Sequence, residues 1–179
     1  MTDWSLTLSA PAKINLYLGV HTERDDRGYH RVDSLMAAVG LSDTVTVTPA
    51  QALTVQTVPA SDFPMQKNTA YRAALAMAEH YGREANVCIT IEKCIPLCAG
   101  LGGPSTDAAA VIAALAELWG IDRTDPALDD IARGIGADVP FFLHASPAFY
   151  VGGGDVLATE YPALPATPVV LVKPREASV

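Results

Sequence analysis

Apolar and polar residues alternate along the first third of the chain, which is the pattern of strands with one buried face. Pro11 interrupts the first alternating stretch and predicts a bend between two strands rather than one continuous strand. The polar stretch 24–28 ends in a glycine and predicts a loop. The predicted strands are residues 5–10, 14–20, 33–40, 44–48, 53–57 and 86–92.

Helical spacing appears after Asn68, where apolar residues recur every three or four positions. Asn68 is placed to cap the first helix, and Gly82 is placed to end it. Pro126 follows a capping residue and opens the last helix. The predicted helices are residues 69–80, residues 105–119, and a third from 124 to near Gly134 or Gly136.

The end of the chain, residues 141–172, alternates short β-like runs with glycines and prolines. No internal repeat, low-complexity segment or linker divides the chain. Strands come first, and mixed strands and helices follow. This order predicts an α+β fold with helices on one face of a sheet.

Composition and charge narrow the class of protein. The chain has 179 residues, of which 50% are hydrophobic and 18% charged, so we expect one folded domain. The formal net charge of -8 argues against binding to nucleic acid or to an anionic membrane surface. Because the overall field is repulsive to anions, a phosphate site would have to rest on backbone amides and a few placed cations.

The chain carries no sign of export or of a membrane span. No apolar run reaches the roughly 18 residues that a transmembrane helix needs, and no basic segment precedes an apolar one at the N-terminus. Cys88, Cys94 and Cys98 are an odd number without C-x-x-C spacing, which favours reduced thiols over a disulfide or a zinc site. We expect a cytoplasmic protein that binds neither membranes nor nucleic acid and has no metal site built from its own side chains.

The strongest chemical feature is the segment 96–109, in which a glycine-rich turn joins a strand to a helix. Glycines let backbone N–H groups approach a ligand, and the helix N-terminus adds unpaired N–H groups and the positive end of its dipole. Ser105 and Thr106 can add hydroxyls to a phosphate oxygen or a magnesium shell. The residue order fits neither a Walker A loop nor a Rossmann fingerprint. Phosphate binding is favoured, and a purely structural connection stays open.

Three segments resemble one family of small-molecule kinases. Residues 10–16 (Ala-Pro-Ala-Lys-Ile-Asn-Leu), with Gly-Tyr-His at 28–30, resemble the N-terminal signature of the 4-diphosphocytidyl-2-C-methyl-D-erythritol kinases. Residues 96–109 resemble the second motif of the GHMP kinase superfamily, to which those kinases belong. Residues 136–142 (Gly-Ala-Asp-Val-Pro-Phe-Phe), followed by 152–155, resemble the family's aspartate motif and the turn after it. Order and spacing agree along nearly the whole chain.

The resemblance implies the superfamily's N-terminal fold, a two-layer α+β sandwich with a left-handed β-α-β crossover. It implies that ATP, with Mg²⁺, donates its γ-phosphate to the 2-hydroxyl of 4-diphosphocytidyl-2-C-methyl-D-erythritol in non-mevalonate isoprenoid synthesis. A mevalonate-type or homoserine-type kinase is the alternative within the superfamily. A non-catalytic nucleotide-binding or scaffold domain is the alternative from another class.

The resemblance also assigns roles to individual residues. Asp138 would accept the proton of the substrate hydroxyl, and Lys13 would keep Asp138 ionised and neutralise charge on the transferring phosphoryl group. The alternative for Asp138 is an aspartate that only caps a turn. Substrate recognition falls to Asn15, Tyr29 and His30, of which Tyr29 and His30 form the cytidine-recognition pair. The nucleotide-binding positions are Asn68, Lys93, Pro96, Ala99, Gly100, Leu101, Gly102, Gly103, Ser105 and Thr106.

The loop departs from the family pattern at three positions. Pro104 and Cys98 stand where the family usually has glycine, and Thr106 stands where it has serine. Thr106 keeps a hydroxyl. Pro104 lacks an N–H, although proline suits the first position of a helix. We expect a weakened but present phosphate site.

Length is the largest departure from the family. Residues 1–174 correspond to the N-terminal ATP-binding domain, and 175–179 would begin a second domain that closes the cleft in family members. We therefore expect weak or no phosphorylation by this chain alone. We also expect an exposed apolar surface where the second domain would dock, with a tendency to self-associate.

Overall fold

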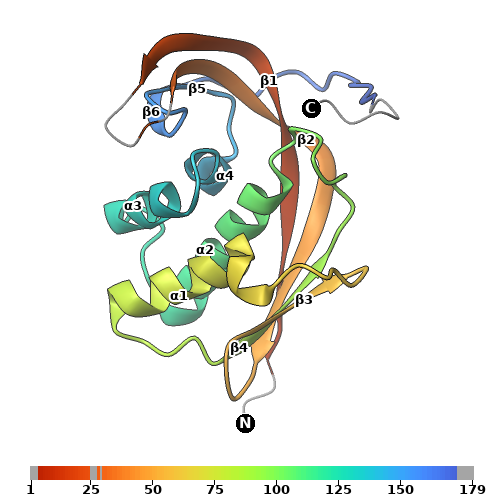
Figure 1. Cartoon of the computed structure of the whole chain (residues 1–179), viewed down its shortest axis with the longest axis vertical. Helices are drawn as coiled ribbons and strands as arrows, with labels where there is room; N and C mark the ends of the chain where they lie inside the picture. Colours follow the sequence, from red (N-terminus) through yellow and green to blue (C-terminus); the bar gives the residue numbers. More distant parts are fainter. Residues whose placement is uncertain (1–3, 25–27, 29, 173–179) are drawn as a thin grey trace.

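The computed structural model describes residues 4–24, 28 and 30–172. Strands β1 (Leu6–Arg24) and β2 (His30–Pro49) pair antiparallel and form a long ribbon that runs most of the length of the molecule (Figure 1). The other strands and all of the helices are arranged around this ribbon.

Two predicted strand breaks are wrong. Pro11 lies inside β1, where the register shifts between Pro11 and Lys13 instead of ending the strand. Because β1 pairs with β2 alone, Pro11 sits on an edge strand, where its missing N–H costs no ladder hydrogen bond. The predicted strands 33–40 and 44–48 are likewise parts of β2.

The remaining strands extend the sheet on both ends of β2. Its order is β3–β4–β2–β5–β6, with β1 on the other side of β2. Strands β3 and β4 pair in parallel, and α1 connects them, so they form the expected β-α-β unit. The bounds are β3 Thr54–Val58, β4 Val87–Glu92, β5 Ala148–Val151, β6 Val156–Glu160 and α1 Thr69–Tyr81.

Helices α1, α2 (Gly103–Trp119), α3 (Pro126–Ile135) and α4 (Val139–His144) gather on one side of the sheet (Figure 1), so the predicted two-layer α+β fold is confirmed. Helix α2 lies at the centre and contacts α1, α3, α4, β1 and β2. Its small residues, from Ala108 to Ala116, are almost all buried, which allows this close approach.

The predicted helix ends agree with the structure. The Asn68 side chain accepts a hydrogen bond from Ala70 N and caps α1, which ends at Gly82 in the left-handed conformation. Asp125 caps α3 in the same way. Figure 1 also shows the short 3₁₀ helix Met65–Lys67 ahead of α1.

The predicted β-like character of residues 141–172 is confirmed only for β5 and β6, and it is wrong at its start and at its end, where residues 161–172 form neither strand nor helix. Residues 139–144 form α4, because Pro140 in the first turn favours helix initiation and Phe141 and Phe142 bury their rings. Within the described ranges, no helix is long and apolar enough to cross a membrane.

Candidate active site

The glycine-rich turn between β4 and α2 is shaped by two left-handed glycines. Gly100 and Gly102 have φ of 70° and 77°, values that residues with a side chain rarely adopt. A Cβ on Gly102 would lie 2.6 Å from Phe142 Cζ and 3.2 Å from Lys13 Cγ. The missing side chain therefore lets the loop pass directly over α4 and β1.

The backbone amides of the loop divide into two groups. The amides of Ser105 and Thr106 donate to the Gly102 carbonyl at 3.0 and 2.9 Å and are satisfied within the first turn of α2. Among the described residues, none accepts a hydrogen bond from the amides of residues 100–103. Amides of this kind at a helix N-terminus are suited to bind phosphate oxygens.

Lys13 connects β1 to this loop. Its backbone amide donates to Leu101 O at 3.0 Å. Its side chain is buried, and its ammonium donates to Asn15 Oδ1 at 2.8 Å and lies 3.6 Å from Asp138 Oδ2. Asn15 in turn donates to Ser34 Oγ at 2.7 Å, so the position of Lys13 is held from β2 as well.

Asp138 precedes α4, but its side chain makes no capping hydrogen bond. The side chain is 37% exposed, and its charged neighbour is Lys13. This geometry disfavours the reading of Asp138 as a turn cap. It leaves a partly exposed carboxylate beside a buried ammonium, an arrangement that can accept a proton from a bound hydroxyl.

Lys93, predicted to bind nucleotide, lies below the loop between two buried carboxylates. Its ammonium donates to Asp43 and, at 2.6 Å, to Asp107 Oδ2. The other oxygen of Asp43 accepts from the amides of Cys94 and Ile95 at 2.6 and 2.7 Å. Asp43 therefore anchors the chain where it leaves β4 and enters the loop.

Burial and charge act in opposite directions on this cluster. Burial raises the pKa of Asp107 to about 7, even though the neighbouring Lys93 ammonium lowers it. Burial alone would lower the pKa of Lys93, but the Asp107 and Asp43 carboxylates outweigh it and raise that pKa. At neutral pH, Asp107 is thus close to its protonation midpoint.

The other predicted nucleotide residues surround the same loop. The Thr69 hydroxyl donates to Pro104 O, which brings the N-terminus of α1, with Asn68 beside it, to the start of α2. Ser105 is half-buried and Thr106 is buried. Pro96 and Ala99 lie in the turn between β4 and α2.

The predicted substrate residues are not all in one place. Asn15 lies next to Lys13, whereas His30 is exposed at the far end of the ribbon, with Nδ1 hydrogen-bonded to His21 O at 2.9 Å. On β2, Asn15 pairs with Met36, which is six residues from His30. About 20 Å of strand therefore separates the level of Asn15 from His30. Tyr29 lies outside the described residues.

Three residues of the site did not stand out in the sequence. Asp43 sits in a Ser-Asp-Thr stretch that resembles a turn, and Phe142 reads as a core residue. Asp107 could have been found, because it is the one acid in the alanine-rich first half of the helix after the loop.

Comparisons with known proteins agree with this geometry. Residues 68–146 match the family described as GHMP kinases N terminal domain. A crystal structure of 4-(cytidine 5'-diphospho)-2C-methyl-D-erythritol kinase superposes with a TM-score of 0.70 at 40% identity, over 86% of this chain and 54% of that one. Mevalonate kinase from Methanococcus jannaschii superposes with a TM-score of 0.64 at 13% identity, over 89% of this chain and 56% of that one, which shows a shared fold.

The loop and these matches show that the chain has the N-terminal fold of the GHMP kinases, and residues 68–146 match that family's model. Within that family, its sequence is similar to the 4-diphosphocytidyl-2-C-methyl-D-erythritol kinases. The kinase of Mycolicibacterium gilvum is 46% identical over 160 residues, covering 87% of this chain and 49% of the relative. The kinase of Mycolicibacterium smegmatis is 45% identical over 164 residues, covering 89% and 50%. The chain thus spans about half the length of the curated relatives it matches.

Proposed function

We propose that this chain is the nucleotide-binding half of a kinase that transfers the γ-phosphate of ATP to the 2-hydroxyl of 4-diphosphocytidyl-2-C-methyl-D-erythritol. The observation that carries the proposal is the convergence of a lysine–aspartate pair with the glycine-rich loop. The Lys13 ammonium lies 3.6 Å from Asp138, while the Lys13 amide is bonded to the loop at Leu101 O. The names of the relatives supply the substrate.

In the proposed reaction, Asp138 accepts the proton of the substrate hydroxyl as that oxygen bonds to phosphorus. Its partial exposure leaves it accessible to a substrate hydroxyl, and the Lys13 ammonium lies 3.6 Å from its Oδ2. The same ammonium can stabilise negative charge on the transferring phosphoryl group. Asn15 holds the Lys13 side chain in this position.

The loop is proposed to bind the phosphates of ATP. The amides of residues 100–103 are available as donors within the described part of the chain, and the N-terminus of α2 adds its dipole. Bound ATP supplies the phosphoryl group, and Mg²⁺ shields the phosphate charge. Ser105 and Thr106 are the proposed hydroxyl contacts, and Asn68, Lys93, Pro96 and Ala99 complete the nucleotide-binding set.

The substrate is proposed to lie along the β1–β2 ribbon, with its two ends at different levels of the strands. Asn15 would contact the methylerythritol end near Asp138, and His30 and Tyr29 would recognise the cytosine end. The separation of about 20 Å along β2 between the level of Asn15 and His30 supports an extended substrate.

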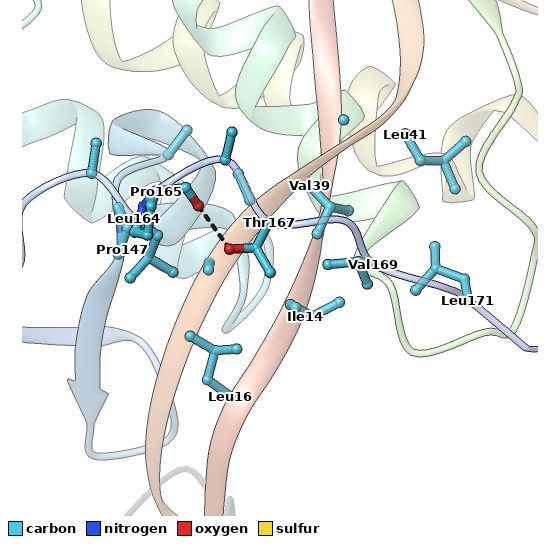
Figure 2. Close-up of a pocket in the computed structure, with 16 residues that line it drawn as sticks. Ile14, Leu16, Val39, Leu41, Pro147, Leu164, Pro165, Thr167, Val169 and Leu171 are labelled. Atoms are coloured by element: carbon cyan, nitrogen blue, oxygen red, sulfur yellow. Dashed lines mark hydrogen bonds between the residues drawn. The ribbon is translucent and has the colours of Figure 1, made fainter.

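A second domain is proposed to cover an apolar groove beside the ribbon. The groove has a volume of about 780 Å³, and its lining includes Ile14 and Leu16 of β1, Val39 of β2, and Val169 and Leu171 of the last segment (Figure 2). Leu16 in this lining is exposed, as are Leu18 and Val20 further along β1 and Val170 and Val172 in the last segment. Without a partner, a surface of this kind favours self-association of the chain. Sedimentation showing only monomer at high concentration would contradict that.

The function is tested by a turnover assay with ATP, Mg²⁺ and 4-diphosphocytidyl-2-C-methyl-D-erythritol. We expect little turnover from the chain alone and clear turnover when it is fused to the C-terminal half of the Mycolicibacterium smegmatis relative. In the fused protein, Asp138→Asn should lower kcat by about 10²–10⁴-fold. Asp130→Asn, which changes a side chain of α3 that is 74% exposed, serves as a control and should leave kcat unchanged. A fused protein that binds ATP but never transfers phosphate to this substrate would refute the proposal.

A non-catalytic nucleotide-binding domain is the second candidate. It is favoured by Cys98, which holds φ of 54° in the loop without the freedom of a glycine, and by Pro104, which removes one amide from the start of α2. This candidate predicts ATP binding without turnover in the fused protein.

A further inference from the structure

A buried cluster of two acids and one base lies beneath the glycine-rich loop. Asp43 comes from β2, Lys93 from the end of β4, and Asp107 from the start of α2. The Asp43 side chain is fully buried, and the Asp107 side chain is 6% exposed. The cluster holds two carboxylates for one ammonium, in a place where unpaired charge is costly.

The two carboxylates differ in how completely they are satisfied. Asp43 uses one oxygen for Lys93 and the other for the amides of Cys94 and Ile95. Asp107 uses Oδ2 for Lys93, but its buried Oδ1 has no hydrogen-bond partner among the described residues. Asp43 is therefore the fixed member of the cluster, and Asp107 is the member whose state can change.

The cluster is also in contact with the loop. A Cβ on Gly103 would lie 3.4 Å from Lys93 Nζ, so the ammonium lies directly against the residue that starts α2. Asp107 is four residues further on, about one helical turn from the proposed phosphate site. A negative charge here opposes the binding of phosphate to the N-terminus of the same helix.

We propose that Asp107 is a positioning residue for nucleotide binding, which shares Lys93 with Asp43 in the free protein and becomes neutral when phosphate occupies the loop. Neutralisation removes the repulsion between Asp107 and phosphate and leaves Lys93 paired to Asp43 with an ammonium hydrogen to spare for the nucleotide. This inference rests on the proposed phosphate site.

The proton has a defined origin. The charged groups that act on Asp107 are Lys93, at the end of β4, and Asp43, on β2. Together with burial, these groups raise the pKa of Asp107 to about 7. Above neutral pH, the Asp107 carboxyl group of the free protein is therefore mostly ionised. Phosphate oxygens nearby raise that pKa further, and binding takes up a proton from solvent.

Calorimetric titration of the chain with Mg²⁺ and adenylyl imidodiphosphate measures this uptake. Titrations in two buffers of different ionisation enthalpy at about pH 8, where the phosphates keep their charge, give the number of protons bound. We expect uptake by the unchanged chain and by the control Asp130→Asn, and none by Asp107→Asn. From about pH 7.5 to about pH 9, the affinity of the unchanged chain should fall, whereas that of Asp107→Asn should stay level. At about pH 9 the variant should therefore bind the nucleotide roughly threefold to tenfold more tightly than the unchanged chain.

The possible failures are distinguishable. Absence of binding by the unchanged chain refutes the proposed phosphate site and this inference with it. Binding without proton uptake, or with the same uptake in Asp107→Asn, refutes the inference alone. A purely structural role for Asp107 predicts weaker binding by Asp107→Asn at every pH, and that result would also overturn the inference. Asp107→Glu, which restores a carboxylate, should restore the proton uptake.

Discussion

Replacement of Gly102 by alanine tests how the loop is held against Lys13 and Phe142. Two separate penalties follow from the structure. The residue has φ of 77°, and forcing an alanine into the left-handed region costs about 1–2 kcal/mol. The new Cβ would also lie 2.6 Å from Phe142 Cζ, a distance that real Cβ atoms essentially never show.

The second penalty is not easily relieved. Phe142 is only 7% exposed. Its ring packs edge-on against the ring of Phe141, with 5.1 Å between the ring centroids, so it has little room to move. Overpacking of this kind costs about 1–3 kcal/mol. Gly102→Ala should therefore lower the free energy of unfolding by about 2–5 kcal/mol.

Gly100→Ala is the matched control. Gly100 has φ of 70°, but nothing lies within 4 Å of its Cβ position, so this variant carries only the backbone penalty of about 1–2 kcal/mol. Urea unfolding followed by tryptophan fluorescence measures both variants, with equal m-values as the check for two-state behaviour. Equal losses of stability in the two variants would refute the packing of the loop against Phe142 and Lys13.

Two other predictions concern the loop and the buried cluster. Cys98→Gly should raise the free energy of unfolding by about 0.5–1 kcal/mol, because glycine adopts φ of 54° without strain; a loss of stability in urea would contradict this. Asp107 has a pKa raised from 3.8 to about 7, so the native state binds more protons than the unfolded state between those values. The contribution of Asp107 to stability should therefore fall as pH rises from about 4 to about 7, by at most about 4 kcal/mol, and then level off. Asp107→Asn should remove this slope, and thermal or urea unfolding that shows the same slope in the variant would count against the assignment.

Much of the fold could be predicted from local patterns. Asn68, Gly82 and Asp125 lie where helices begin and end, because their cap geometry depends on a few neighbouring residues. The strand break expected at Pro11 was wrong because an edge strand accepts a proline at a bulge. Whether a strand lies at an edge depends on its partners, which the local pattern does not contain.

The candidate site was only partly predictable for the same reason. Lys13, Asp138 and the glycine-rich loop were found as motifs, and the structure brings them together. The Asp43–Lys93–Asp107 cluster joins residues from β2, from the end of β4 and from α2. No local pattern shows that three segments so far apart in the chain meet in one buried place.

Nucleotide binding by the unchanged chain is the most direct test of the central claim. A calorimetric titration with Mg²⁺ and adenylyl imidodiphosphate should give saturable one-to-one binding, because the amides of residues 100–103 and the start of α2 need no further domain to bind phosphate. Gly102→Ala should weaken that binding. Absence of any binding by a folded chain would contradict the assignment of this loop as a phosphate site.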